Sequence, residues 1–407
     1  MHAKTHPERV TFRETEILTV AAQHLNTMGV SLEWFSEIAA SLNLTRPALY
    51  KYTADREDLL FRCYAESCDA LERRIDAAIA THRDPLPALS ALLDLPDDNK
   101  EVAVISEIAA LDPERQAVIE RRLERLEERL AALLSEGMDS GLFRKLDSGV
   151  VARIIMGMTS WLPLYRRWGG TVGDMSRVMR GSRELLLQGL ATDRQPLRID
   201  DARLVSIGRR SPNLFDKEAV TAAKRERILA TASALFNRRG IGATRIEDVA
   251  AQLGLTKRAI YHAIGQKQAL IDACVERAYG YFLDLMEAGR QMDGTRLQAL
   301  CTCTRDVVLA ELDPEIPTLA PYVGFGQLSS KERLRVVDYG QRMHSGYLQM
   351  LEWGIAENSI RPVASESIVA CLPGVFSWVA NISDEGPVRR KKIATEIAGV
   401  VAHGILA

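Results

Sequence analysis

Five side chains that could bind a nucleic acid lie within seven residues of this sequence. The segment reads TKRAIYH, and it supplies a hydroxyl, an ammonium, a guanidinium, a phenol and an imidazole group from Thr256, Lys257, Arg258, Tyr261 and His262. Such groups pair with phosphate oxygens and with base edges when a short helix presents them on its exposed face. Ile260 interrupts the polar run, and we expect it to point into a core.

The residues around this segment predict the helices that position it. Apolar residues recur at helical spacing in Ile228, Leu229, Ala232, Leu235 and Phe236. Gly240 follows them, where a left-handed residue typically ends a helix. Residues 244–247, TRIE, match a capping box and predict a second helix that Gly254 ends. Thr256 is then the expected N-cap of a third helix over residues 257–262.

The same arrangement occurs twice, 211 residues apart and without a gap. Matched pairs include Gly29 and Gly240, Leu44 and Leu255, Thr45 and Thr256, Tyr50 and Tyr261, and Leu59 and Leu270. The first copy has a weaker helix start, because Glu33 stands where the second copy has Thr244. An internal repeat on this scale predicts two similar structural halves.

Two helices joined by a short glycine-containing turn form a helix-turn-helix, whose second helix enters the major groove of DNA. The alternative is an ordinary helical hairpin, but two copies with polar residues suited to DNA favour DNA binding. The sequence resembles the TetR family of transcriptional regulators, through LTKRAIYHAIGQKQAL and LTRPALYKYTADREDLL. The resemblance covers about 50 residues of each half, and the rest of each half matches loosely. It implies that Arg56 and Lys267 bind phosphate.

The two predicted DNA-binding heads differ in charge. Residues 209–270 contain twelve basic and five acidic residues, whereas residues 1–59 contain six basic and eight acidic residues. Phosphate neutralisation supplies most sequence-independent affinity, so we expect the second head to contribute more of it. The predicted DNA-binding residues are Thr45, Arg46, Tyr50, Lys51, Tyr52, Arg56, Thr244, Arg245, Thr256, Lys257, Arg258, Tyr261, His262 and Lys267.

The repeat extends beyond the heads, and 407 residues are too many for one core. With an offset of 217, Gly354 matches Gly137, Arg361 matches Arg144, Gly374 matches Gly157 and Trp378 matches Trp161. We predict an all-α fold of two tandem TetR-like halves. The heads are 1–62 and 221–272, the regulatory and dimerisation domains are 63–192 and 273–407, and the linker is 193–220. Residues 101–111 are expected to be helical.

TetR-family members are usually homodimers, so the simplest hypothesis is a fused pseudo-dimer. Its regulatory domains would pack through residues 115–136, 151–168, 332–357 and 365–382. The resemblance implies a repressor released by a small-molecule ligand. The two heads carry unlike residues at matched positions, which predicts a double-stranded operator with two unlike half-sites. One alternative is a ligand-independent or architectural DNA-binding protein whose first head has lost specific binding. A rival assembly is a homodimer of the tandem chain with four heads.

Aromatic residues give the only pointers to a ligand pocket. Those of the first half are Trp161, Tyr165 and Trp168, and those of the second are Tyr322, Phe325, Trp353 and Trp378, with His344 beside them. Ordinary core packing is the commoner role of such side chains. The resemblance, and not this pattern, implies the ligand.

Several classes of protein and site are not expected. The sequence has no phosphate-binding glycine loop, no HExxH and no GxSxG, so we predict no enzyme activity and no cofactor. Cys301 and Cys303 lack a zinc spacing, which predicts no metal site and leaves the six cysteines as buried thiols. No apolar run approaches ~18 residues, so no membrane span is expected. The first residues lack a signal peptide's apolar region, and we expect a cytoplasmic protein.

Overall fold

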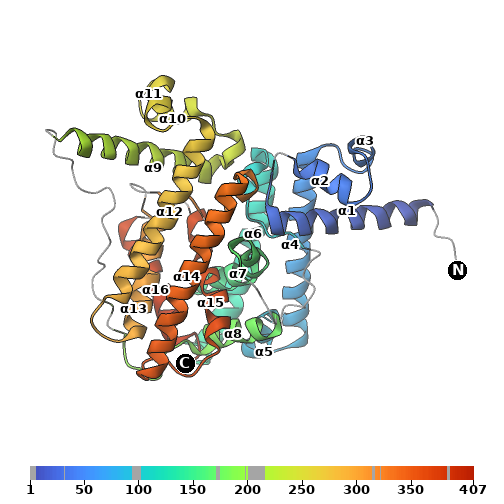
Figure 1. Ribbon diagram of the computed structural model, residues 1–407. Coiled ribbons are helices and arrows are strands. Elements are labelled where there is room, and N and C mark those ends of the chain that lie inside the picture. Colours follow the sequence, from blue (N-terminus) through green and yellow to red (C-terminus); the bar gives the residue numbers. More distant parts are fainter. Residues whose placement is uncertain are drawn as a thin grey trace.

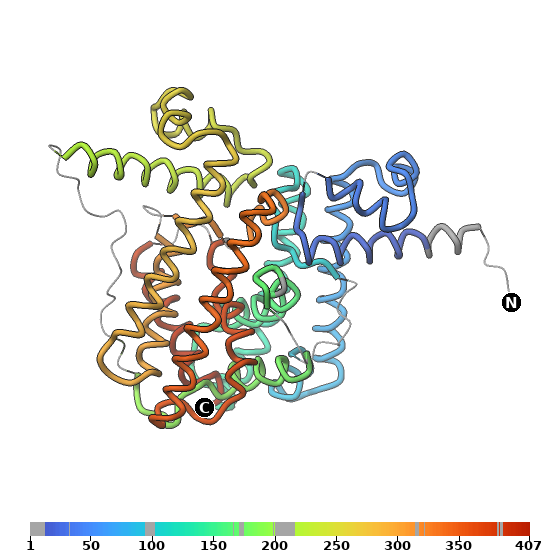
Figure 2. The backbone as a smooth tube through the Cα atoms, in the orientation of Figure 1, coloured from blue at the N-terminus to red at the C-terminus, as the bar shows by residue number. Residues whose placement is uncertain are grey.

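Helices make up every regular element of the described chain (Figure 1). The computed structural model describes residues 6–31, 33–93, 102–170, 175–197, 199, 216–313, 317–320, 322–382 and 386–407. The predicted all-α fold is confirmed for these residues. Figure 2 follows the chain from the first head (blue) through cyan and green helices to the second head, and then into orange and red helices.

The two halves contain corresponding elements in the same order. The first half consists of α1 (His6–Met28), α2 (Trp34–Ser41), α3 (Arg46–Leu49), α4 (Arg56–Thr81), α5 (Pro85–Leu93), η2 (Ile108–Ala110), α6 (Pro113–Asp139), α7 (Ser148–Leu164), η3 (Tyr165–Trp168) and α8 (Met175–Gln188). The second half begins with α9 (Lys217–Ala243), α10 (Ile246–Gln252), α11 (Lys257–Ala263), α12 (Lys267–Arg290) and α13 (Arg296–Glu311). It ends with η4 (Phe325–Gln327), α14 (Ser330–Ala356), α15 (Ser365–Cys371), η5 (Leu372–Val375), η6 (Ser377–Asn381) and α16 (Pro387–His403).

The predicted helix over residues 101–111 is wrong: only η2 is helical there, and residue 101 lies outside the described residues. The chain before η2 is instead held by Asn26 of α1. The Asn26 side-chain nitrogen Nδ2 donates to the Val102 carbonyl at 2.9 Å, and its side-chain oxygen Oδ1 accepts from the Val104 amide at 2.7 Å. Backbone groups that a helix would pair internally are thus satisfied by a side chain.

The predicted capping box at residues 244–247 is also wrong. Helix α10 begins at Ile246, with Arg245 as its N-cap, and the Arg245 amide donates to Asp248 Oδ2 at 2.7 Å. Thr244 is fully buried, and its hydroxyl donates to the Gly240 carbonyl at 2.8 Å. Gly240 has a φ of 74°, which breaks α9 as predicted. The predicted linker is too long at its end, because residues 217–220 already belong to α9. Its residues 198 and 200–215 lie outside the described chain.

The halves pack on each other through α7 and α8 of the first half and α15, η5 and α16 of the second. The predicted role of residues 115–136 in this interface is wrong. Helix α6, which contains them, packs on α4, α5 and α7 of its own half. Its Arg122 and Arg129 form ion pairs with Asp69 and Asp76 of α4. Since one face of α6 is buried on α7 and another is ion-paired to α4, it contributes little surface to the other half. Helix α14 does reach the first half, at η3.

Contacts between the halves occur in reciprocal pairs. The Arg144 amide donates to the Ile405 carbonyl at 2.8 Å, and the matched Arg361 amide donates to the Leu190 carbonyl at 2.9 Å. Isolated antiparallel bridges accompany them, between Phe143 and Leu406 and between Ile360 and Ala191. Each half therefore binds the end of the other half in the same way.

Two matched glycines make the closest approach between these halves. A Cβ on Gly157 of α7 would collide with the carbonyl oxygen of Gly374, and a Cβ on Gly374 would lie 2.8 Å from Met158 Cα and 2.9 Å from Trp161 Cβ. Contacts at these distances leave no room for any side chain.

We expect Gly157→Ala to destabilise the protein, because the added methyl group must push the halves apart. Overpacking of this kind typically costs about 1–3 kcal/mol. Gly399→Ala in α16 is the matched control: its Cβ would have no atom within 4 Å, so stability should stay the same or rise by up to ~1 kcal/mol. Urea unfolding followed by circular dichroism measures both. A wild-type midpoint for Gly157→Ala would contradict this packing.

Candidate nucleic-acid interface

In the second head, α11 presents its polar residues on one surface. Thr256 caps the helix, and its Oγ1 accepts from the Ala259 amide at 3.3 Å. Ile260 is fully buried, as predicted, and fixes the rotation of the helix. The remaining candidates are all exposed: Thr256, Lys257, Arg258, Tyr261 and His262. Gly254, with a φ of 63°, makes the turn between α10 and α11.

The first head repeats this geometry with a shorter recognition helix. Thr45 Oγ1 accepts from the Ala48 amide at 3.3 Å, and Leu49 is the buried residue that anchors the helix. Asn43 has a φ of 55°, which is positive like that of its match Gly254. Helix α3 ends at Leu49, so Lys51 and Tyr52 lie in the turn beyond it and not on the helix as expected. Thr45, Arg46, Tyr50 and Lys51 are exposed, whereas Tyr52 is half-buried.

A side-chain network accounts for the early end of α3. The Thr53 hydroxyl donates to Asp58 Oδ2 at 2.7 Å, and the Ala54 amide donates to the same oxygen at 3.1 Å. These bonds hold the chain in a turn and compete with another turn of helix. In the second head the matched residues are Ile264, Gly265 and Ala269, which cannot form this network, and α11 continues to Ala263.

Both recognition helices carry a tyrosine that is partly packed and partly accessible. Tyr50 is 45% exposed, and its ring centroid lies 5.1 Å from that of Phe35 in α2. Tyr261 is 39% exposed, and Lys257 Nζ lies 5.5 Å from its ring centroid. Each ring therefore supports the helix surface while part of the side chain remains accessible to a ligand.

The four remaining candidates lie at the edges of the heads. Arg245 is exposed. Thr244 is buried, so the Thr244 side chain cannot contact DNA, and the prediction for Thr244 is wrong. Arg56 begins α4 and lies 6.0 Å from the Trp34 ring, where burial lowers its pKa without removing its charge. Lys267 begins α12 and donates to the Gly242 carbonyl at 3.4 Å, and burial lowers its pKa.

An intramolecular ion pair holds one recognition residue of the second head. Lys257 Nζ lies 2.5 Å from Glu247 Oε1 of α10, with both side chains about half exposed. This hydrogen bond lowers the pKa of Glu247 and raises that of Lys257. Ser36 occupies the matched position in the first head, where Arg46 instead lies 5.9 Å from the Phe35 ring. Among the described residues, only the second head pairs the first basic residue of its recognition helix with an acid in this way.

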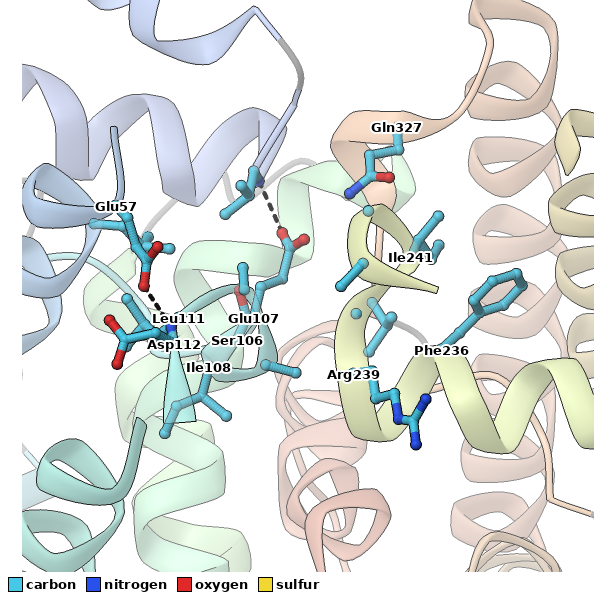
Figure 3. A pocket seen from close by; sticks show the side chains of 18 of the residues that line it. Glu57, Ser106, Glu107, Ile108, Leu111, Asp112, Phe236, Arg239, Ile241 and Gln327 are labelled. Atoms are coloured by element: carbon cyan, nitrogen blue, oxygen red, sulfur yellow. Dashed lines mark hydrogen bonds between the residues drawn. The ribbon is translucent and has the colours of Figure 1, made fainter. Parts of the chain in front are cut away.

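A cleft of about 620 Å³ separates the two heads (Figure 3). Glu57, η2 and the start of α6 form one wall, and Phe236, Arg239 and Ile241 of α9 form the other. The acidic groups of the first wall are engaged: Glu57 accepts from the Asp112 amide, and Glu107 accepts from the Val30 amide at 2.9 Å. The cleft lies where a change in its width would alter the separation of the heads.

The aromatic candidates do not form one pocket in each half. Trp161 stacks on Trp168 at 4.7 Å, and Trp168 lies 6.3 Å from Phe325 of the other half. The Tyr165 hydroxyl lies 2.8 Å from His344 Nδ1, which again joins the two halves. These contacts form an aromatic cluster across the interface between the halves. The cavity that Phe325 borders measures about 10 Å³, enough for a single water.

The other three aromatic candidates lie apart from that cluster. Tyr322 is buried, and the Trp378 indole donates to the Val375 carbonyl at 2.8 Å. Trp353 is 44% exposed, with Arg290 5.8 Å from its ring. A ligand that uses any of these aromatic candidates stays a prediction.

Sequence inspection missed the residues that join the heads to the regulatory domains. Asn237 repeats the role of Asn26: it donates to the Thr318 carbonyl at 2.8 Å and accepts from the Ala320 amide at 3.0 Å. The signal was available, since Asn26 and Asn237 match in the 211-residue register. Arg167 of η3 is 2% exposed and donates to the Asn26 carbonyl at 3.1 Å. It had no such signal, because the matched position 384 is aspartate.

Cysteines, membrane-spanning helices and metal-binding clusters complete the description of the chain. The six cysteines are free and buried, as predicted. In the described ranges, no helix has the length and apolar character that crossing a membrane requires. The same part of the chain contains no group of three or more histidine, cysteine or acidic residues placed to hold a metal ion.

Two family profiles match the chain, one in each half. The profile of the tetracyclin repressor-like C-terminal domain matches residues 89–190. The profile of bacterial regulatory proteins of the tetR family matches residues 228–274, which contain α10 and α11.

Individual relatives match about half of the chain. The HTH-type transcriptional repressor KstR2 of Mycolicibacterium smegmatis is 19% identical over 203 residues, covering 47% of this chain and 94% of the relative. KstR2 of Mycobacterium tuberculosis is 24% identical over 194 residues, covering 45% and 93%. Among solved structures, the TetR family regulator PfmR from Thermus thermophilus aligns at 22% identity with a TM-score of 0.39, covering 44% of this chain and 98% of that one. The chain contains domains of the TetR family of bacterial regulatory proteins, including its helix-turn-helix, and it is similar to transcriptional repressors of that family.

Proposed function

We propose that this chain is a pseudo-dimeric transcriptional repressor that binds an operator with two unlike half-sites and is released by a small-molecule ligand. The observation that carries the proposal is the placement of the recognition helices. Helices α3 and α11 lie at the same end of the molecule, away from α5 and α8 (Figure 1), and both expose polar residues. A homodimer of helix-turn-helix subunits presents two such helices to successive major grooves.

The reciprocal contacts support a fused dimer. In a two-fold interface, a residue that contacts a second residue is itself matched by the inverse contact. Arg144 with Ile405 and Arg361 with Leu190 follow this rule, as do Gly157 and Gly374. The curated relatives support it as well, because less than half of this chain spans more than nine-tenths of KstR2. We keep the domain division predicted from the sequence as part of this proposal, and we extend the second head from residue 221 to residue 217, where α9 begins.

The differences between the heads support unlike half-sites. Helix α3 has a single turn with Arg46 and Pro47, whereas α11 has seven residues with Lys257, Arg258 and His262. Different side chains at the start of a recognition helix select different bases. The surplus of basic residues in the second head supports a larger share of phosphate binding there.

A ligand could release DNA only if it favours one separation of the heads over another. The cleft between the heads and the aromatic cluster across the halves are both placed where a bound molecule would have this effect. A ligand-independent, architectural DNA-binding protein remains the second candidate, favoured by the acidic balance of the first head. A footprint over one half-site or none would support it. Sedimentation of the protein with operator DNA distinguishes one tandem chain from a homodimer with four heads.

Binding-site selection from random duplexes should return two unlike half-sites. Within the selected operator, Lys257→Ala and Arg258→Ala should each cost about 1–3 kcal/mol if they contact bases. Arg46→Ala should have a matching effect on the other half-site only. Titrations against operators with one half scrambled assign each residue to its half-site. A perfect palindrome, or equal losses on random DNA, would contradict base recognition by unlike heads.

Glu247→Gln should strengthen DNA binding, because it frees Lys257 and removes a negative charge beside the recognition helix. We expect a roughly two- to tenfold gain at low salt that shrinks as salt rises, since the effect is electrostatic. Glu287→Gln is the matched control: Glu287 pairs with Arg290 at 2.9 Å on the regulatory helix α12. Fluorescence anisotropy over a salt series measures both variants. Weaker binding by Glu247→Gln would mean that the ion pair presents Lys257 to DNA.

A further inference from the structure

We propose that Gly326 and Ala109 are positioning residues that act between the halves, each fixing the DNA-binding head of the other half. This inference rests on the proposed function, in which both heads bind the operator together. It assigns control of head placement to η2 and η4, two short turns to which the sequence alone gave no role.

The first contact joins the second half to the first head. Gly326 lies in η4, and a Cβ built on it would lie 2.7 Å from the Met28 carbonyl oxygen and 2.8 Å from the Ser31 amide nitrogen. A Cβ on Gly29 would in turn lie 3.5 Å from the Gly326 nitrogen. Backbone therefore meets backbone where α1 ends and the chain turns toward α2.

The second contact is the same arrangement with the halves exchanged. A Cβ on Gly240, where α9 breaks, would lie 3.3 Å from the carbonyl oxygen of Ala109 in η2. Gly240 matches Gly29 at the offset of 211, and Gly326 matches Ala109 at the offset of 217. Two contacts related in this way are what a two-fold arrangement requires, so neither is an isolated accident of packing.

Each turn also contacts the head of its own half. Glu107, directly before η2, accepts from the Val30 amide of the first head, and Gly324, directly before η4, packs against Ile241 of the second. Asn26 and Asn237 hold the chain that leads into each turn. Each turn therefore contacts both heads, whereas α4 and α12 each connect a regulatory domain to its own head.

The surroundings of the two contacts differ. Beside Gly326, the buried Arg167 donates to the Asn26 carbonyl and lies 5.7 Å from the Phe325 ring. Beside Ala109, the 620 Å³ cleft opens between η2 and α9. Backbone atoms in a filled site cannot yield to an added methyl group, so Gly326 is the more sensitive position to test.

The test is Gly326→Ala, with DNase footprinting of the selected operator. We expect a roughly tenfold loss of affinity and weaker protection of the first head's half-site, although residue 326 belongs to the second half. Protection of the second head's half-site should persist. The matched control is Gly280→Ala in α12 of the same half, where an added Cβ has no atom within 4 Å.

Amide hydrogen exchange of the free proteins provides a second readout that does not depend on DNA. Gly326→Ala should accelerate exchange around residues 28–31 but not around residues 240–243. If this variant fails to fold, Asn237→Ala tests the same connection, since it loosens the chain before η4 and should also accelerate exchange at residues 28–31. Footprint or exchange changes confined to the second head would overturn the inference. A wild-type protein that protects no half-site would refute the proposed function, while the exchange result would still decide the inference.

Discussion

The structure depends on one repeated interaction, in which each half binds the closing segment of the other through backbone hydrogen bonds. Arg144 and Arg361 supply the amides, and the carbonyls of Ile405 and Leu190 accept them. Backbone pairing of this kind does not rely on particular side chains, so the two sequences could diverge while the interface kept its geometry. Glycines at residues 157 and 374 preserve the close approach that the pairing needs. The rest of the molecule, including the placement of both heads, is built outward from this contact.

The heads themselves were predictable because their signals are local. The apolar spacing, the N-caps Thr45 and Thr256 and the buried Ile260 follow from patterns within a few residues, and the structure bears them out. The N-cap of α10 was predicted one residue too early, at Thr244 instead of Arg245. The two positions look alike in the sequence, because an acidic residue follows each of them three residues later, and Asp248 is the one that accepts from the N-cap amide. The length of α3 could not be predicted from helix propensity, since Asp58 ends it from the following helix.

The connections between domains were the least predictable feature. The composition of residues 101–111 predicts a helix. Asn26, which lies 76 and 78 positions earlier in the sequence, instead forms hydrogen bonds with Val102 and Val104 and holds them in a non-helical conformation. The apolar stripe of α6 would suit either an interface between the halves or the core of one half. The structure shows the second arrangement, because α6 packs on α7 of its own half. Choices of this kind depend on partners distant in sequence, which a local pattern cannot identify.

The reciprocal interface also bears on the protein concentration that is needed to occupy an operator. A regulator assembled from separate subunits falls apart on dilution, and its operator occupancy then falls with the square of its concentration. In the proposed pseudo-dimer, the same polypeptide supplies the equivalent of the second subunit, so its local concentration is fixed by the covalent connection. On that proposal, even a few copies of the chain would each be able to bind both half-sites of the operator.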